Sequence, residues 1–361
     1  MRSALKILGV NLLVFLVLIL IIEGAVRLLY SEILPQNLDP NLFEPFKYRD
    51  TYGYKSNSHG NEFGASYITD DHGFRINEKS RQHKVPSQHK TVLVLGDSVS
   101  VGIGINADEG YPYLLETRLT AQRVLNASVT GYGISDYVAA LQGTIRDVKP
   151  DQVLIGFCLN DTSVTSQANI LSMIQRRKEQ MESIPDEKRY PNPAVRWLRY
   201  INDNYFNFND ALKKYSRTYL LLKSLATDSS RDYFAADEAM YKDPRTLEFL
   251  TNEFFRLKEL AQAHHASLVI FLFPYEFQLR SPGRETQLPQ RIIRQAGLRA
   301  GVTIFDLYDD LSNYLRSYQV MSKSIYLFND PMHFNARGHQ VIANLTYAKL
   351  TENRSTTQVM D

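Results

Sequence analysis

Residues 92–98, Val92-Leu93-Val94-Leu95-Gly96-Asp97-Ser98, form a short aliphatic run that ends in a small residue, an acid and a hydroxyl. An unbroken apolar run of this length is typical of a strand buried on both faces of a parallel sheet. In open α/β sheets, ligands bind in the crevice beyond the carboxyl ends of the strands. The run therefore predicts a buried strand that presents Ser98 as a candidate nucleophile.

The segments around this strand alternate between strand-like and helix-like patterns. Strands are expected at 92–96, 124–129, 152–157, 267–273 and 302–305, and helices at 111–122, 135–147, 244–265 and 287–299. Such alternation implies parallel strands joined by crossover helices. We expect a three-layer α/β/α sandwich around a five-stranded parallel sheet.

A base for Ser98 is available near the other end of the chain. Asp330-Pro331-Met332-His333 precedes a segment, 338–350, whose apolar residues have helical spacing. A serine hydroxyl is a weak nucleophile, and a neutral imidazole must take its proton during attack on an acyl carbon. A carboxylate then fixes the tautomer of the imidazole. His333 is the candidate base and Asp330 its partner.

Two further strand ends could hold the oxyanion that such an attack creates. The run 126–133 ends in glycines, and the backbone N–H of Gly131 is a candidate donor. The run 153–161 ends in Asn160-Asp161, and the side-chain amide of Asn160 is the other candidate. Taken singly, each of these short motifs is also compatible with a turn or a helix cap.

Together, the four motifs resemble the SGNH family, also called GDSL-type esterases and acyltransferases, and they occur in the family's order. Gly96-Asp97-Ser98 resembles its first block, Gly131 its second, Asn160-Asp161 its third and Asp330–His333 its last. The resemblance implies a flavodoxin-like fold, the catalytic residues Ser98, His333 and Asp330, and an oxyanion hole made by the Ser98 N–H, the Gly131 N–H and the Asn160 amide.

One position departs from the family pattern. The third block of the family usually has glycine two residues before the asparagine, where this chain has Cys158. A small side chain fits there if φ stays negative, so we expect only a modest local adjustment. As the single cysteine, Cys158 also excludes an intrachain disulfide framework.

No group of residues in the sequence has metal-ligand spacing, and we predict neither a metal nor a cofactor.

The N-terminus predicts a membrane anchor. Residues 7–26 are almost wholly apolar, which is about the length of ~20 residues that a helix needs to span a bilayer. Arg2 and Lys6 precede this run and favour a cytoplasmic N-terminus, although Arg27 follows it. A cleaved signal peptide is the alternative, but no clear cleavage site follows the run. The rest of the chain is then extracytoplasmic, in the periplasm if the source is bacterial.

The expected organisation has four parts. Residues 1–30 form the anchor, 31–90 a loop-rich linker that packs on the domain, 91–350 an SGNH hydrolase domain with a cap-like insertion at 162–243, and 351–361 a polar tail. Within the linker, Asp70-Asp71-His72-Gly73-Phe74-Arg75 resembles a segment of membrane-anchored family members, and a packing role is expected for it. A net charge of +2 and the lack of arginine-rich motifs argue against nucleic-acid binding.

These features predict a membrane-anchored, extracytoplasmic serine esterase that removes acyl groups, acetyl among them, from a carbohydrate or a lipid-linked glycan. An O-acyltransferase that modifies an exported polysaccharide would use the same residues, with a sugar hydroxyl in place of water. A third hypothesis is a non-catalytic glycan-binding protein on the same fold. The sequence names no protein partner.

Overall fold

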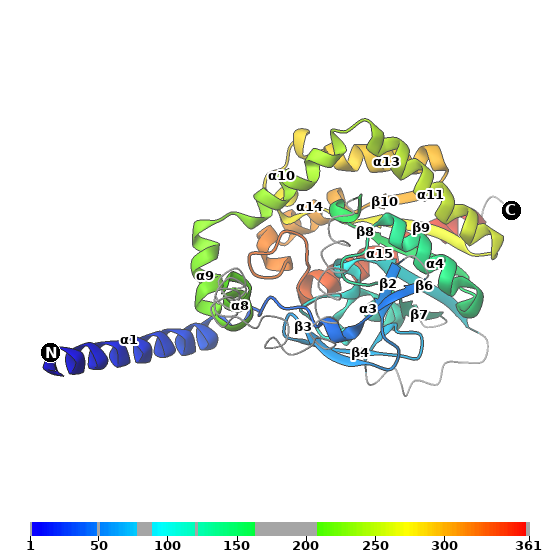
Figure 1. Ribbon diagram of the computed structural model, residues 1–361. Coiled ribbons are helices and arrows are strands. Elements are labelled where there is room, and N and C mark those ends of the chain that lie inside the picture. Colours follow the sequence, from blue (N-terminus) through cyan, green and yellow to red (C-terminus); the bar gives the residue numbers. More distant parts are fainter. Residues whose placement is uncertain (1, 49–50, 78–88, 120–121, 163–207, 359–361) are drawn as a thin grey trace. The chain divides into compact units, whose positions relative to one another are not determined.

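The computed structural model describes residues 2–48, 51–77, 89–119, 122–162 and 208–358 (Figure 1). The chain forms two compact units. The small unit consists of Met1–Asn37 and Ser183–Asp228, and the sheet unit of Leu38–Glu182 and Ser229–Asp361. Each unit is described by itself.

Five neighbouring strands of the sheet unit are parallel, in the order β10-β9-β8-β6-β7. They are β6 (Lys90–Gly96), β7 (Gln122–Asn126), β8 (Gln152–Phe157), β9 (Ser267–Leu272) and β10 (Thr303–Asp306). Each lies within a few residues of a strand expected from the sequence. The aliphatic run of β6 is fully buried, as expected for a central strand covered on both faces.

Helices cover the two faces of this sheet (Figure 1). The main ones are α3 (Tyr111–Arg118), α4 (Ile134–Val148), α11 (Arg245–Ala263), α13 (Leu288–Ala300) and α15 (Ala336–Gln358). The chain steps from β6 to β7 in one direction and from β7 to β8 and onward in the other, so right-handed crossovers place α3 and α4 on opposite faces. Accordingly, α4, α11 and α13 pack side by side, and α3 packs against α15. The three-layer α/β/α architecture is confirmed.

The sheet is wider than expected. Three strands extend the β7 edge in antiparallel fashion: β5 (Arg75–Ile76), β4 (Ala65–Thr69) and β3 (His59–Glu62). These strands of the described chain therefore make an eight-stranded mixed sheet, and the prediction of five parallel strands covers only its parallel part.

The same segment also corrects the expectation of a loop-rich linker at 31–90. Besides β3–β5, it contains a hairpin of β1 (Phe43–Tyr48) and β2 (Thr51–Tyr54). Its aromatic residues drive this structure, because Tyr52, Tyr54, Tyr67 and Phe74 are fully buried in the main core. The segment from Leu38 onward is thus part of the sheet unit.

Further helices belong to the sheet unit. They are α2 (Ser98–Val101), α10 (Ser229–Tyr241), α12 (Glu276–Arg280) and α14 (Tyr308–Ser317). The last helix, α15, runs through Gln358, so most of the tail expected at 351–361 is helical. Of the insertion expected at 162–243, residues 163–207 lie outside the described residues. Its cap-like role stays a prediction.

The small unit contains α1 (Arg2–Leu29), α8 (Phe208–Tyr215) and α9 (Arg217–Ala226). Residues Leu5–Leu29 of α1 have a mean hydropathy of 2.9 and are long and apolar enough to cross a membrane. The large apolar side chains from Leu5 to Ile22 are 45–70% exposed. The apolar side chains of this helix are therefore not buried in a protein core.

Candidate active site

Ser98 lies where the sequence predicted it, at the first position of α2 directly after β6. The carboxylate of Asp97 caps this short helix, accepting the backbone N–H of Val99 at 2.8 Å. The strands pass very close beneath the helix, because a Cβ at Gly96 or Gly156 would come within 2.3 or 2.1 Å of the Ser100 hydroxyl. Glycine at these two positions therefore lets the Ser98 turn sit directly on the strand ends.

His333 and Asp330 come from the loop before α15. The Oδ1 atom of Asp330 accepts the backbone N–H groups of Met332 at 2.9 Å and His333 at 2.7 Å, so this side chain organises its own loop. The loop is also fixed from outside, since the N–H of Glu276 donates to the carbonyl of Pro331 at 2.8 Å. These bonds leave the His333 ring little freedom to turn.

The structure joins these three side chains in one chain of hydrogen bonds. The Nε2 atom of His333 lies 2.8 Å from the Oγ atom of Ser98. Its Nδ1 atom lies 2.9 and 2.8 Å from the two carboxylate oxygens of Asp330. Ser98 is 7% exposed, and the side chains of His333 and Asp330 are 15% and 9% exposed. This is the arrangement in which a histidine accepts the proton of a serine and a carboxylate stabilises the resulting imidazolium.

The charge state of His333 is biased by its neighbours. Burial lowers the pKa of the imidazole, but the charge and hydrogen bond of Asp330, with a further contribution from Asp97, outweigh it and raise this pKa above its ordinary value of 6.5. Burial also raises the pKa of Glu62, from 4.5 to about 7. Glu62 is therefore a second group that titrates close to neutrality.

We therefore expect kcat/KM for ester hydrolysis to fall as the pH drops through the raised pKa of His333, because only the neutral imidazole accepts the serine proton. The midpoint of the ascending limb is expected above pH 6.5. Steady-state kinetics across the pH range measure it. The variant Glu62→Gln removes a group whose pKa is about 7 and should leave the limb in place. A midpoint below 6.5, or its loss in Glu62→Gln, contradicts this assignment.

The predicted oxyanion donors lie at the neighbouring strand ends. Asn160, in the 3-10 turn Leu159–Thr162 after β8, places its Nδ2 atom 3.4 Å from the Oδ2 atom of Asp97, which in turn is 3.2 Å from the Ser98 hydroxyl. Gly131 has a φ of 83° and lies beyond β7, where the N–H of Val129 pairs with the carbonyl of Gly96. The donor roles of Gly131 and Asn160 stay predictions.

The unusual Cys158 is accommodated by its neighbour Asp161. The buried carboxylate of Asp161 accepts the N–H of Cys158 at 2.7 Å and the hydroxyl of Tyr137 at 2.6 Å. Cys158 itself is fully buried, and it is absent from the described non-glycine residues with positive φ. The turn therefore keeps the backbone that we expected for a small side chain at this position.

Two residues that the sequence analysis missed support Asn160. The hydroxyl of Tyr275, which follows β9, lies 3.4 Å from the Oδ1 atom of Asn160 and donates to the carboxylate of Asp237 at 2.5 Å. Because the Tyr275 hydroxyl has one proton and donates it to Asp237, its contact with Oδ1 borders the Asn160 amide, whose nitrogen faces Asp97. Neither Tyr275 nor Asp237 lies in a recognisable motif, so no sequence signal identified them.

The segment Asp70–Arg75 fixes the other end of α2. Asp70 accepts the N–H groups of His72 and Phe74, which forms the expected turn. The buried guanidinium of Arg75 donates to four carbonyls, those of Ser66, Val101, Gly102 and Ile105, at 2.6–3.0 Å. Since Val101 and Gly102 end α2, Arg75 holds the helix that carries Ser98. The segment Asp70–Arg75 thus has the expected packing role, with the carbonyls at the end of α2 among its partners.

The β1–β2 hairpin fixes the loop that carries Gly131. The hydroxyl of Tyr52 donates to the carbonyl of Thr130 at 3.0 Å, and the hydroxyl of Tyr54 lies 2.7 Å from the Thr130 hydroxyl. On the other side of Gly131, Asp136 accepts the N–H of Gly133 at 2.9 Å and the hydroxyl of Thr51 at 2.6 Å. The segment expected to be a linker thus supports one wall of the site.

His339 is a buried histidine that the sequence analysis did not consider. Its Nδ1 atom accepts the backbone N–H of Tyr111 at 3.1 Å, and its ring stacks on the ring of Tyr111. Burial lowers its pKa to about 3, so the imidazole stays neutral. His339 joins α15 to α3 and does not compete with His333 as a base.

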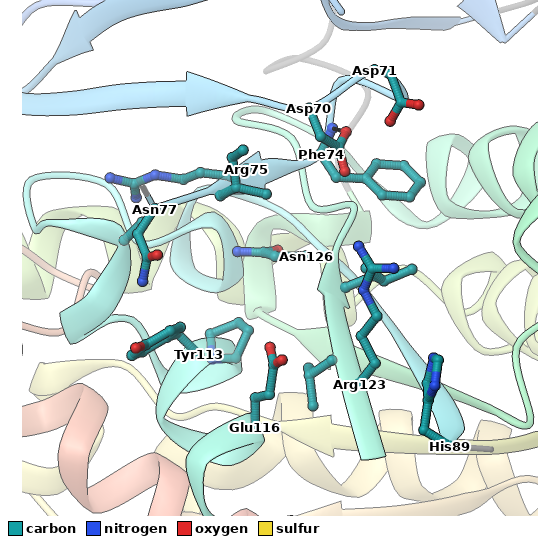
Figure 2. A pocket seen from close by; sticks show the side chains of 15 residues that line it. Asp70, Asp71, Phe74, Arg75, Asn77, His89, Tyr113, Glu116, Arg123 and Asn126 are labelled. Atoms are coloured by element: carbon teal, nitrogen blue, oxygen red, sulfur yellow. Dashed lines mark hydrogen bonds between the residues drawn. The ribbon is translucent and has the colours of Figure 1, made fainter. Parts of the chain in front are cut away.

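A cavity of about 410 Å³ lies elsewhere, against α3, β5 and β7 (Figure 2). Figure 2 shows Tyr113 and Glu116 of α3 facing Asn126 and Arg123 of β7 across it. None of Ser98, His333 and Asp330 lines it. We therefore do not assign it to ester chemistry.

One curated protein is similar to part of this chain. Esterase TesA of Pseudomonas aeruginosa is 33% identical over 98 residues, which are 25% of this chain and 49% of that esterase. The match therefore spans about half the length of this relative.

Two solved structures also match this chain over most of its length. LAE5, described as an alpha/beta hydrolase enzyme from the metagenome of Lake Arreo, is 18% identical, with 74% of this chain and 97% of that chain covered and a TM-score of 0.41. Esterase EstA from Pseudoalteromonas sp. is 14% identical, with 74% and 99% covered and a TM-score of 0.40.

Residues 94–341 match the GDSL-like Lipase/Acylhydrolase family, and this range begins in β6 and ends in α15. It includes Ser98, Gly131, Asn160, Asp330 and His333. Because the match spans more than half of the chain, the protein belongs to the GDSL-like Lipase/Acylhydrolase family, as the order of its four sequence blocks predicted.

Proposed function

We propose that this protein is a serine esterase that cleaves acyl esters through an acyl-enzyme on Ser98. The observation that carries the proposal is the continuous hydrogen-bonded set of Ser98, His333 and Asp330. Membership of the lipase/acylhydrolase family supports the same chemistry.

In the proposed reaction, the Nε2 atom of His333 takes the proton of Ser98 while Oγ forms a bond to the acyl carbon. The N–H groups of Ser98 and Gly131 and the Asn160 amide stabilise the oxyanion. The ester C–O bond then breaks, and the imidazolium gives its proton to the leaving alcohol. Water attacks the acyl-enzyme with His333 again as base, which releases the acid and restores Ser98.

We infer that α1 is retained as a membrane anchor, with the N-terminus in the cytoplasm and the sheet unit on the extracytoplasmic side. The carboxylate of Glu23 in α1 accepts the N–H groups of Arg217 and Thr218 at 2.9 and 3.1 Å, at the start of α9. It also accepts the hydroxyl of Ser216 at 3.0 Å. Cleavage of α1 as a signal peptide would leave these donors without Glu23, which favours an uncleaved helix.

Replacement of Glu23 by alanine tests this attachment. Hydrogen exchange at the amides of Arg217 and Thr218 is expected to accelerate about five- to thirtyfold, because a lost helix cap costs about 1–2 kcal/mol. Exchange mass spectrometry of the full chain in detergent measures it. Glu32→Ala, at an exposed carboxylate of the same unit, is the matched control. Unchanged exchange in Glu23→Ala would remove this support for a retained anchor.

An anchored enzyme of this kind would act on acylated carbohydrates or glycolipids at the outer face of the membrane, the periplasm in a bacterium. The test uses the full chain in detergent with an activated acetyl ester, with and without candidate glycans. Free acetate that depends on Ser98 and not on glycan supports the esterase. Acetylated glycan formed at the expense of acetate would instead establish an O-acyltransferase. If folded protein formed neither free acetate nor acetylated glycan, the esterase and the O-acyltransferase hypotheses would both be contradicted.

A further inference from the structure

The turn between β3 and β4 has an unusual sequence for its backbone. Glu62 pairs with Ala65, so Phe63 and Gly64 form a two-residue hairpin turn, and their φ angles are 49° and 79°. Turns with positive φ at both positions strongly prefer Asn, Asp or Gly at the first one. A bulky residue is strained there, and such strain is retained where the surrounding structure determines it.

The ring of Phe63 lies beside the candidate catalytic histidine. Its centroid is 6.3 Å from that of the His333 imidazole, with the planes inclined by 51°. The side chain of Phe63 is only partly buried, so it is not a core residue of the sheet unit. Phe63 is the turn's only large side chain, and it comes from the segment that the sequence presented as a linker.

The turn is also held firmly at its base. Glu62 is fully buried, and its Oε2 atom accepts the hydroxyls of Tyr54 at 3.0 Å and Thr130 at 3.1 Å. Thr130 is the neighbour of Gly131. One buried carboxyl group thus links the turn that carries Phe63 to the loop of the predicted oxyanion donor.

We propose that Phe63 forms the part of the substrate site that contacts the alcohol portion of the ester. This rests on the proposed function, because His333 is the group that would give a proton to the leaving alcohol oxygen. A side chain beside the imidazole would then meet the alcohol portion and not the acyl chain. A flat aromatic face suits the apolar face of a cyclic alcohol, so the substrate class is an ester of a ring alcohol, such as an O-acylated sugar.

A role in the turn alone does not account for a phenylalanine at position 63. If the residue only formed the turn, asparagine would serve better, since it adopts positive φ more readily. The chain offers a matched control in Phe46, a second phenylalanine with positive φ, 57°, which is 74% exposed in β1. Asparagine at either position relieves the same backbone strain, but only Phe63 borders His333.

The test compares acetate esters that differ only in the alcohol, using the full chain in detergent. For Phe63→Asn we expect kcat/KM to fall about tenfold for cyclohexyl acetate and a 6-O-acetyl glucoside, and to stay within about twofold for methyl acetate. Its thermal midpoint should be unchanged or higher. Phe63→Tyr should keep the preference for ring alcohols, and Phe46→Asn should change neither rate.

The outcomes separate this proposal from the one on which it rests. Equal losses of kcat/KM on cyclic and methyl esters, or no loss on either, in a chain whose hydrolysis depends on Ser98, would overturn the role of Phe63 alone. Wild-type protein that is folded but hydrolyses none of the three esters would overturn the proposed function and this inference together.

Discussion

Replacement of Ser98 by alanine is expected to lower kcat for ester hydrolysis by roughly 10³-fold or more, to the background that the remaining site supports. The hydroxyl lies 2.8 Å from the His333 Nε2 atom and has no substitute in that position. Without it, no acyl-enzyme forms, and the oxyanion donors have no covalent intermediate to stabilise. Steady-state hydrolysis of an activated acetyl ester measures the loss.

The matched control for this variant is Ser100→Ala, two residues along in the same helix. Ser100 is fully buried and its Oγ atom accepts the hydroxyl of Tyr111 at 3.0 Å, so its loss should cost about 1 kcal/mol of stability. Its hydroxyl takes no part in the proposed reaction, and activity should largely remain. If Ser98→Ala kept activity, or if both variants lost it equally, Ser98 would not be the nucleophile.

The largest expected effect on stability comes from Arg75→Met. Methionine keeps much of the apolar side chain but leaves four carbonyl groups, three of them in buried hydrogen bonds, without their cationic donor. It also removes the guanidinium that lies 3.7 Å from the ring centroid of Tyr67. We expect the free energy of unfolding to fall by roughly 4 kcal/mol. Urea unfolding of the full chain in detergent measures this change.

An exposed arginine of the same sheet provides the comparison. Arg123→Met on β7 should change the free energy of unfolding by less than about 0.5 kcal/mol. Because Arg75 holds the carbonyls that end α2, its loss should also reduce activity beyond the fraction that unfolds. A stability loss of similar size in both variants would contradict the specific role of Arg75.

The middle strands of the parallel part of the sheet could be predicted because they are buried on both faces. The aliphatic runs of β6 and β8 indicate strands buried on both faces, and each is followed by a predicted site residue, Ser98 or Asn160. The helices between them follow from their periodicity, and the family's order of motifs then locates the triad. Sequence reasoning of this kind identifies residues that share one edge of a parallel sheet.

The β1–β5 region could not be predicted in this way. Its strands are short and rich in glycine and tyrosine, and their burial depends on a core that the rest of the chain supplies. The turn at Phe63-Gly64 lacks the asparagine that would have marked it as a hairpin. Arg75 was part of a recognised motif, but its acceptors are backbone carbonyls, which every residue has and no sequence pattern reveals.

The support for Asn160 was hidden for a different reason. Tyr275 and Asp237 are separated from it by 115 and 77 positions and are common residue types without a spacing rule. Only the folded chain brings a buried hydroxyl of this kind within reach of the amide. Such supporting groups decide how well a site is organised, and structure is needed to find them.

Covalent trapping of the nucleophile tests the central claim most directly. The full chain in detergent is treated with diethyl p-nitrophenyl phosphate, which phosphorylates activated serines, and is then digested and analysed by mass spectrometry. The account predicts one stoichiometric adduct on Ser98, with parallel loss of esterase activity, and no adduct there in His333→Ala or in denatured protein. Complete inactivation with the adduct on another residue, or full activity with Ser98 modified, would contradict it.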